Sequence, residues 1–373
     1  MPSFVYYDQE QEIKEFALEN IKNFDYWNKL RQIITEQAGS QVADYIFDQQ
    51  AILLGGNLFI ATSTRFNLQN QPEKTYQNLI NIKRVNDVRY LNKFFEAVNS
   101  LLPIEGIYIN SVETYTIRKE RILTRFPLVL NWIIYFFDVL FRRVFPKLPF
   151  IKKIYFWMTQ GNNRVLSKAE TFGRLYSCGF EVISEKQIGK DLYFIARKTR
   201  TPYFDFNPTY GPLVRLERLG KDGKPIKVYK ARTMHPYAEY LQEYIYTHNS
   251  LDDGGKFKND FRVTTLGKFM RKVWLDELPM LINVMKGQLK IVGVRPLSKH
   301  YLSLYPEDVQ KRRLNYKPGL IPPFYVDLPK TLEEIVESEI RYLDAWDKKP
   351  WRTDQRYLRI ALYNILFKKA RSQ

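Results

Sequence analysis

The chain has 373 residues, with 58 Lys or Arg against 40 Asp or Glu, which gives a formal net charge of +18. The length suggests about two domains, and 45% hydrophobic with 26% charged residues excludes a disordered or low-complexity chain. The single cysteine, Cys178, excludes an internal disulfide, and three histidines argue against a histidine-rich zinc site. The acidic start is unlike a signal peptide, and no apolar run reaches the roughly 18 residues of a spanning helix. We therefore expect neither a secreted nor a conventional transmembrane protein.

The positive charge is unevenly distributed. Residues 1–100 hold 10 basic and 12 acidic side chains, residues 101–200 hold 17 and 8, and residues 201–373 hold 31 and 20. The basic excess therefore begins after position 100. On charge alone, nucleic acid, anionic lipid and phosphorylated small molecules are all admissible partners.

The first 200 residues alternate between helical and strand patterns. The expected elements, in chain order, are helices within 8–48, a buried strand at 58–62, a helix at 86–101, a strand at 106–109, a helix at 169–176, and two strands at 179–183 and 192–196. The polar stretch between the last two strands predicts a hairpin. Thr201-Pro202 then marks the expected domain boundary, so that we predict domains at 1–200 and 201–373.

Within the first domain, residues 126–158 combine aromatic and basic side chains. Pro127, Pro146 and Pro149 divide this segment into helical pieces. Basic residues beside a broad aromatic and aliphatic face are typical of a helix that lies in a membrane interface. A buried helical hairpin with a solvated basic edge is the alternative interpretation.

The order of elements over residues 86–198 resembles the C-terminal half of a class I methyltransferase fold, which closes its sheet with a final antiparallel pair. The resemblance implies a Rossmann-like partial sheet. The family's glycine-rich turn after the first strand, and the acid that ends the second, have no counterpart here, because Gly55-Gly56 precedes a strand. We therefore interpret this half as a degenerate, non-catalytic scaffold.

The C-terminal half begins with two short strands, at 212–216 and 226–229, around the turn 220–224. A helix at 263–273 follows, with Leu266, Phe269, Met270 and Val273 expected to face inward and Lys268, Arg271 and Lys272 outward. A further helix, 278–286, starts close to Pro279 and ends at Gly287. The fold class is therefore α/β (α+β), with a Rossmann-like partial sheet first and a helix-rich domain with a small β-hairpin second.

Asp276 and Glu277 stand directly before that last helix. The positive helix end, with basic residues nearby, is expected to lower the pKa values of both carboxylates and keep them ionised. An ionised Asp suits a nucleophile, and an ionised Glu suits a Mg²⁺ ligand. Alternatively, the two acids merely satisfy a helix N-terminus and pair with Arg271.

The stretches "GPLVRLERLGKDGKPIKVYKARTM", "DFRVTTLGKFMRKVWLDELPMLINVMKG", "IVGVRP" and "KPG" resemble the bacterial sugar transferase family, the monotopic polyprenyl-phosphate phosphoglycosyl transferases, over about residues 207–320. The resemblance implies that Asp276 attacks the β-phosphate of a nucleotide diphosphate sugar, with UDP-sugar the expected donor. The phosphosugar on Asp276 then passes to a membrane polyprenyl phosphate, which initiates exopolysaccharide, capsule or O-antigen type glycan assembly.

By the same resemblance, Glu277 holds Mg²⁺, and Arg271 and Arg295 clamp phosphate. Lys272 and Arg232 are further substrate-binding candidates, with solvated surface positions as the alternative. His235 and His300 are interpreted as structural or surface residues. The expected partners are the nucleotide sugar, polyprenyl phosphate and an anionic lipid surface, without nucleic acid. The expected location is the cytoplasmic face of the bacterial inner membrane, monotopic or peripheral.

The sequence departs from the family at several points. Family members carry a long apolar helix before the first strand of the hairpin, whereas this chain has Lys198-Thr199-Arg200-Thr201-Pro202. Residues 126–158 are our candidate replacement for that anchor. Two other function classes stay open: an S-adenosylmethionine-dependent methyltransferase, and a non-catalytic membrane scaffold in glycan biosynthesis.

Overall fold

The computed structural model describes residues 3–5, 24–49, 56–148, 150–204, 211–248, 260–368 and 370. The chain forms two compact units, one made of residues 1–207 with 236–243, the other of 208–235 with 244–373. The domains expected from the sequence, 1–200 and 201–373, differ from these units chiefly in the segment 236–243. The helices expected before residue 24 lie outside the described residues.

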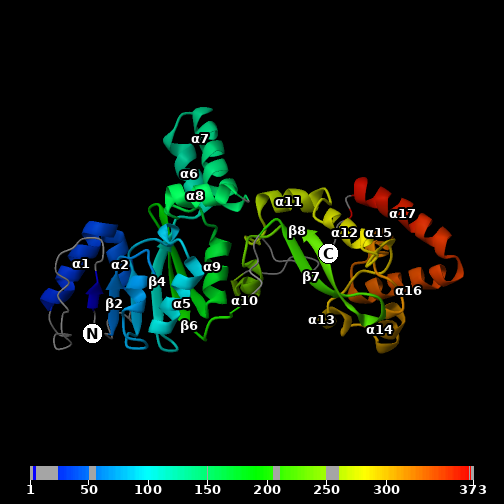
Figure 1. The fold of residues 1–373 in the computed structure, drawn as a ribbon, viewed down its shortest axis with the longest axis horizontal. Helices are drawn as coiled ribbons and strands as arrows, with labels where there is room; N and C mark the ends of the chain where they lie inside the picture. The colour runs from blue at the N-terminus through cyan, green and yellow to red at the C-terminus, as the bar shows by residue number, and fades with distance from the viewer. Residues whose placement is uncertain are drawn as a thin grey trace. The chain divides into compact units, whose positions relative to one another are not determined.

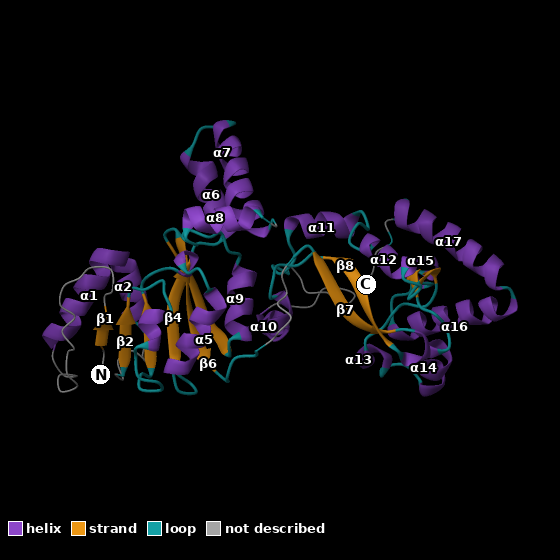
Figure 2. Ribbon diagram, viewed as in Figure 1, coloured by secondary structure: helices purple, strands orange, loops and turns teal. Residues whose placement is uncertain are grey.

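The first unit is built on a six-stranded mixed sheet (Figures 1 and 2). Its strands, in spatial order, are β1 (Ser3–Val5), β2 (Asn57–Ile60), β3 (Asn78–Asn81), β4 (Ile107–Val112), β6 (Asp191–Lys198) and β5 (Phe180–Ile188). The first four are parallel, while β6 is antiparallel to both its neighbours. The predicted hairpin is confirmed, and the sheet closes with the antiparallel pair expected from the methyltransferase resemblance.

Helices cover both faces of this sheet. Successive side chains of β4 point to opposite faces, and residues on both faces pack against helices. Ile109 belongs to a core cluster with residues of α1 (Phe24–Ala38) and α2 (Ser40–Phe47). Tyr108 instead contacts Phe95 of α5 (Leu91–Leu101). The remaining helices of this part are α4 (Phe66–Gln69), η2 (Val85–Asp87), α9 (Lys168–Ser177) and η6 (Ala238–Leu241), with α10 (Gln242–His248) after it. Both faces are thus buried, as expected for a parallel sheet.

A helical protrusion leaves the sheet at the carboxyl end of β4 (Figure 1). It consists of α6 (Tyr115–Arg125), α7 (Leu130–Val139), the π-helical turn η3 (Leu140–Val144), the 3-10 turn η4 (Phe145–Lys147) and α8 (Ile151–Thr159). The breaks fall near Pro127 and Pro146, as predicted from proline's missing N–H. Within the described ranges, no helix is both long enough and apolar enough to cross a bilayer.

The second unit combines a β-hairpin with short helices. Its elements are β7 (Leu213–Leu219), η5 (Lys221–Gly223), β8 (Pro225–Ala231), α11 (Thr265–Lys272), η7 (Leu278–Met280), α12 (Leu281–Met285), β9 (Lys290–Val292), α13 (Lys299–Leu302), α14 (Glu307–Leu314), β10 (Gly319–Ile321), α15 (Phe324–Asp327), α16 (Leu332–Lys348) and α17 (Pro350–Leu366). The hairpin and the helix-rich character agree with the sequence, and Gly287 ends α12 with a φ of 68°.

One orientation was predicted wrongly. Leu266, Phe269 and Val273 of the α11 region were expected to face inward, but each is exposed. The helix instead packs through Gly267, where a Cβ would lie 2.0 Å from the carbonyl oxygen of Thr233. A close backbone approach, which a hydrophobic periodicity does not reveal, therefore decides which face of α11 is buried.

A second close approach joins β9 and β10. A Cβ on Gly319 would lie 2.1 Å from the backbone nitrogen of Gly293, so the two strands meet only without a side chain there. We expect Gly319→Ala to lower the free energy of unfolding by about 1–3 kcal/mol, because the backbones must separate. Urea denaturation measures this change. Gly189→Asn, at an open position with a φ of 56°, is the control and should cost little.

Candidate active site

Strand β8 is held against the segment that carries the carboxylate pair. The backbone N–H of Ala231 donates to the carbonyl oxygen of Asp276 at 2.9 Å. The side chain of Asn283, which is fully buried, accepts from the N–H of Tyr229 at 2.9 Å and donates to the carbonyl oxygen of Lys227 at 2.8 Å. These bonds fix which residues of β8 face the pair.

Lys230 is one residue of β8 placed in this way. Its Nζ donates to Oε1 of Glu277 at 2.6 Å, and the Glu277 side chain is 7% exposed. A buried carboxylate needs a compensating charge, because its desolvation is costly. The Lys230 ammonium supplies that charge.

Asp276 is half-buried, and its electrostatics differ from the prediction. Burial, followed by the neighbouring Glu277 carboxylate, raises the pKa of Asp276 above its ordinary value, and Lys230 and Arg271 oppose the rise. The expected lowering of this pKa is therefore wrong. The helix that follows contributes little, because it is only a 3-10 turn and five α-helical residues, without a side-chain cap from Glu277.

A small recess beside Glu277 is lined by three cationic side chains: Arg218, Lys230 and Arg295. Tyr325 and Phe324 form part of its wall, and the Arg295 guanidinium lies 5.4 Å from the centre of the Phe324 ring. Burial, together with the charge of Arg295, lowers the pKa of Arg218. Three cations and the Glu277 carboxylate give the recess lining a net positive charge, which suits a phosphate or diphosphate ligand.

The backbone at Arg295 is supported by a buried ion pair. Arg313 donates from Nε to Glu339 at 3.0 Å, and both residues are buried. A second nitrogen of Arg313 donates to the carbonyl oxygen of Arg295 at 2.7 Å. The N–H of Gly319 donates to the carbonyl oxygen of Val294 at 2.9 Å. Arg295 therefore extends into the recess from a firmly held backbone.

The structure brings together only part of the predicted set. Glu277 and Arg295 line one recess, with Asp276 next to Glu277 in the chain. Arg271 is exposed and donates to the hydroxyl of Thr233 at 3.0 Å. Arg232 donates to the carbonyl oxygen of Gly211 at 2.7 Å.

The other predicted residues stand elsewhere. Lys272 and His300 are exposed, whereas His235 is buried and its backbone N–H bonds to the carbonyl oxygen of Arg262. Lys272 was predicted to bind substrate, with a solvated surface position as the alternative, whereas the two histidines were predicted to be structural or surface residues. None of the three is among the residues that line the recess.

Sequence reasoning missed Arg218 and Lys230. The feature that could have pointed to them is the register of the hairpin, in which Arg218 pairs with Ile226 and Leu216 with Val228. Because side chains alternate along a strand, Arg218, Val228 and Lys230 share one face of the hairpin. All three line the recess. A register drawn from the turn at 220–224 would have placed both cations on that face.

The residues around Glu277 fit Mg²⁺ only in part. Among the described residues, no group of three or more His, Cys, Asp or Glu side chains could hold a metal ion. Mg²⁺ is commonly bound by one or two carboxylates together with substrate phosphates, so Glu277 with a diphosphate in the cationic recess satisfies this requirement. The donor set therefore fits a metal that arrives with its phosphate ligand.

Comparison with known proteins gives a family match for most of the second unit. Residues 206–366 match the family model described as bacterial sugar transferase. This match agrees with the family that the sequence motifs predicted.

Among the curated relatives, the galactosyl transferase CpsE of Streptococcus agalactiae is 36% identical over 142 residues, which is 36% of this chain and 31% of that protein. The undecaprenyl-phosphate galactose phosphotransferase of Salmonella typhimurium is 34% identical over 36% of this chain and 29% of its own length. A UDP-glucose:undecaprenyl-phosphate glucose-1-phosphate transferase of Klebsiella pneumoniae is 35% identical, with the same coverage. The match thus spans less than a third of each of these relatives.

Solved structures resembling this chain include a SAM-dependent methyltransferase from Thermotoga maritima, 12% identical, with a TM-score of 0.22 over 38% of this chain and 63% of that one. A methyltransferase from Mesorhizobium loti is 10% identical, with a TM-score of 0.25 over 48% and 99%. TM-scores this low do not identify a fold. The Rossmann-like character of the first unit follows instead from its strand order.

The raised pKa of Asp276 has a consequence for stability. An acid with a higher pKa in the folded state than in the unfolded state destabilises the fold once it ionises, so the penalty is present above the folded pKa and absent below the unfolded one, at about 3.9. We expect Asp276→Asn to raise the melting temperature at neutral pH, with the gain disappearing in acid. Differential scanning calorimetry across pH measures this. Asp260→Asn should instead lower the melting temperature, because Asp260 pairs with the buried Arg262.

The ion pair between Lys230 and Glu277 gives a second prediction. Lys230→Met leaves the Glu277 carboxylate buried without its partner, so we expect a loss of about 1–3 kcal/mol of unfolding free energy. The double variant Lys230→Met/Glu277→Gln should lose less unfolding free energy than the two single variants lose together. The same cycle on the exposed pair Arg341 and Glu337 should give a coupling below about 0.5 kcal/mol. Equal couplings for the two pairs would contradict this interpretation.

Proposed function

We propose that the second unit transfers a sugar 1-phosphate from a nucleotide diphosphate sugar, with UDP-sugar as the expected donor, to membrane polyprenyl phosphate. The reaction would initiate exopolysaccharide, capsule or O-antigen type glycan assembly. Support comes from the family match and from the names of two relatives, both of which include undecaprenyl phosphate. The single observation that carries the proposal is a carboxylate pair beside a recess with three cations.

In the first step, a carboxylate oxygen of Asp276 forms a bond to the β-phosphorus of the donor. The bond from that phosphorus to the bridging oxygen breaks, and the nucleoside monophosphate leaves with the bridging oxygen. Arg218, Lys230 and Arg295 bind the diphosphate oxygens and offset the charge that develops on the leaving group. The sugar phosphate then remains on Asp276 as an acyl phosphate.

In the second step, a phosphate oxygen of polyprenyl phosphate attacks the phosphorus of the acyl phosphate. The bond between phosphorus and the Asp276 oxygen breaks, which restores the carboxylate and yields polyprenyl diphosphate sugar. Glu277 is the residue that would hold Mg²⁺, which supplies neutralisation of phosphate charge when bound. Lys230, which donates to Glu277, keeps that carboxylate oriented toward the recess.

A membrane acceptor requires the protein to work at a bilayer. We propose that the chain acts at the cytoplasmic face of the bacterial inner membrane, as a monotopic or peripheral protein with an anionic lipid surface as partner. The lack of a helix of spanning length among the described residues is compatible with this arrangement.

The covalent step gives a direct test. Mixing the protein with Mg²⁺ and a panel of UDP-sugars should release UMP and leave a phosphosugar on the peptide that contains Asp276, detected by mass spectrometry. Asp276→Asn should lower UMP release by about 10³-fold or more, because the nucleophile is lost. Glu217→Gln, an exposed change on β7, is the matched control. UMP release at the wild-type rate from Asp276→Asn would overturn the mechanism.

The pH dependence gives a further test. Only ionised Asp276 attacks phosphorus, and burial raises its pKa above the ordinary value. The rate of the first step should therefore rise with pH, with a midpoint above about 4. Single-turnover UMP release across pH measures this, and circular dichroism at each pH confirms that the protein stays folded. A midpoint below about 4 would contradict the role of Asp276.

A further inference from the structure

The helical protrusion of the first unit carries a concentrated apolar surface at its tip. Six exposed residues line a shallow groove there: Leu128, Val129, Trp132, Ile133, Phe136 and Phe137. Leu128 is 84% exposed. Phe150, directly before α8, and Trp157 of α8 are also exposed, at 84% and 79%. Soluble surfaces rarely expose so many large apolar side chains side by side, so this surface is made to be covered.

Cationic side chains accompany the apolar tip. Residues 115–158 hold 9 basic and 2 acidic side chains, a net charge of +7. Lys119 lies 5.3 Å from the ring centre of Trp132, and Lys152 and Lys153 are exposed on α8. One of the two acids, Asp138, is engaged by Arg118 at 2.6 Å and by Arg142 at 3.3 Å. The surface offered to a partner is therefore positive.

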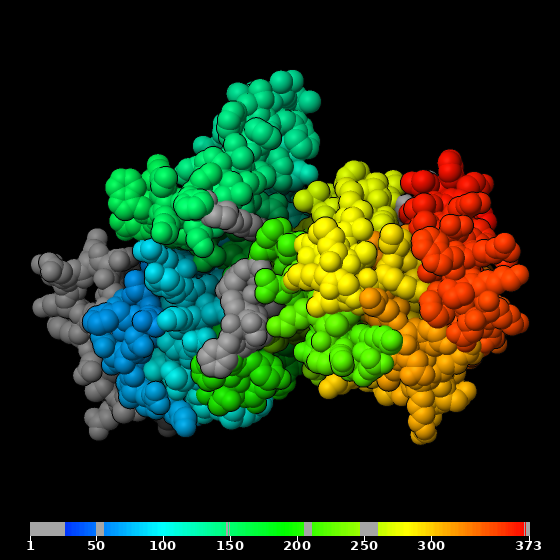
Figure 3. All heavy atoms as spheres, turned by 45° about the vertical axis from the view of Figure 1, so that its right-hand side comes forward, coloured from blue at the N-terminus to red at the C-terminus, as the bar shows by residue number. Residues whose placement is uncertain are grey.

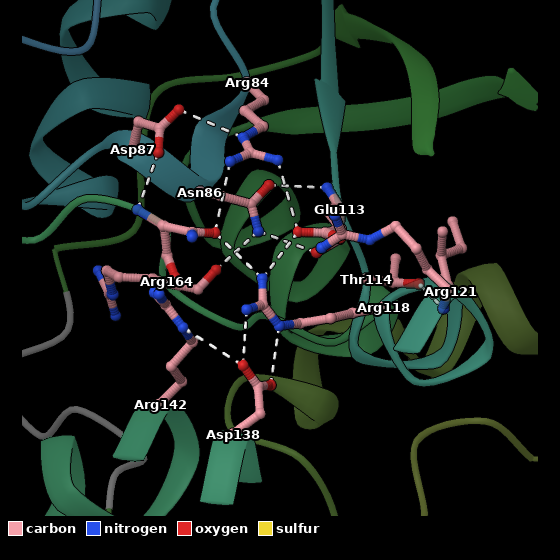
Figure 4. Close-up of polar contacts among 12 residues, drawn as sticks. Arg84, Asn86, Asp87, Glu113, Thr114, Arg118, Arg121, Asp138, Arg142 and Arg164 are labelled. Atoms are coloured by element: carbon pink, nitrogen blue, oxygen red, sulfur yellow. Dashed lines mark hydrogen bonds and ion pairs between the residues drawn. The ribbon is translucent and has the colours of Figure 1, made fainter. Parts of the chain in front are cut away.

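A cluster of buried charges fixes the protrusion to the sheet (Figure 4). Glu113, directly after β4, is 1% exposed and pairs with Arg84 at 3.4 Å, Arg118 at 3.0 Å and Arg121 at 2.6 Å. Arg118 reaches from Glu113 to Asp138 on α7, so one guanidinium joins the sheet edge to the second helix of the protrusion.

This cluster occupies the carboxyl edge of the parallel strands, where open α/β sheets usually bind ligands. Asn86 contributes as well, because its side chain donates to the carbonyl oxygens of Glu113 and Arg164 and accepts from the N–H of Glu113. Side chains that are paired with one another in this way support a structural role for the edge. The protrusion thus stands on a rigid base, and Figure 3 shows it rising from the rest of the first unit.

Two occupants could cover the tip: a lipid surface or a second copy of this chain. A second copy would bring another +7 segment on a chain of net charge +18, and like charges oppose that contact. An anionic bilayer complements the charge, and its interface accepts Trp, Phe and Lys side chains. The ten residues of α7 span about 15 Å, half of a hydrocarbon core of about 30 Å. That reach suits insertion from one side.

We propose that the protrusion formed by α6, α7 and α8 docks the first unit on an anionic lipid surface, with the groove of α7 buried among acyl chains and the lysines of α8 against the headgroups. The first unit then serves as a membrane-binding module. This inference rests on the proposed function only in that the acceptor lies in a membrane.

Binding of the 373-residue chain is measured by sedimentation with vesicles of phosphatidylglycerol and phosphatidylcholine, and with vesicles of phosphatidylcholine alone. Trp132→Ser/Phe136→Ser should weaken binding to the anionic vesicles roughly tenfold or more, because both side chains leave the interface. Phe66→Ser, at an exposed position on α4, should leave binding unchanged. Equal binding by all three proteins would overturn the proposal.

The charge is tested separately with Lys152→Gln/Lys153→Gln against Lys93→Gln/Lys190→Gln, which removes two exposed lysines elsewhere in the first unit. The α8 pair should weaken binding several-fold at low salt and less at high salt. Sedimentation velocity tests whether a second copy of the chain covers the tip instead. A wild-type dimer that is lost in the tip variant, Trp132→Ser/Phe136→Ser, would overturn the lipid assignment.

UMP release in detergent micelles containing polyprenyl phosphate separates this inference from the proposed function. The tip variant should keep the micellar rate of the wild type and lose only vesicle binding. A wild type that binds vesicles through the tip but releases no UMP from any donor would refute the transferase proposal and leave the docking surface in place. Melting temperatures equal to the wild type, as exposed positions predict, show that the variants are folded.

Discussion

The hydrogen bonds of the Asn283 side chain to β8 determine the geometry of the candidate site. They align the strand with the segment that follows the carboxylate pair, and this alignment places Lys230 on Glu277. A shift of one residue in that alignment would turn Lys230 to the other face of the hairpin and leave a buried carboxylate uncompensated. The polar contacts of one buried amide thus set which charges share the recess.

Two of the charges at the candidate site, those of Asp276 and Arg218, are unfavourable in the free protein. Burial and a like-charged neighbour disfavour ionised Asp276, and Arg218 loses hydration close to another guanidinium. A phosphate-bearing ligand would relieve the second effect, because its anionic oxygens would neutralise the two guanidinium groups. Strain of this kind, resolved by binding, is typical of functional sites.

In the first unit, the carboxyl edge of the parallel strands holds a network of ion pairs. The carboxyl ends of its parallel strands, which bind ligands in many α/β proteins, here hold Glu113 and its arginine partners. The desolvation of that carboxylate is offset by several cations, and Arg118 extends the network to the protrusion. The edge therefore positions a surface element at a place where open α/β sheets usually bind a ligand.

The sequence by itself determined the sheet-and-helix character of both units, the two hairpins, the proline breaks of residues 126–158, and the family of the second unit, because these depend on local patterns and contiguous motifs. It also predicted Glu277 and Arg295 as site residues. Only the tertiary structure decided that Arg218 and Lys230 join them, that α11 turns its apolar side outward, and that the pKa of Asp276 rises. Those outcomes depend on burial and on close approach between segments far apart in the chain, which periodicity along one segment does not encode.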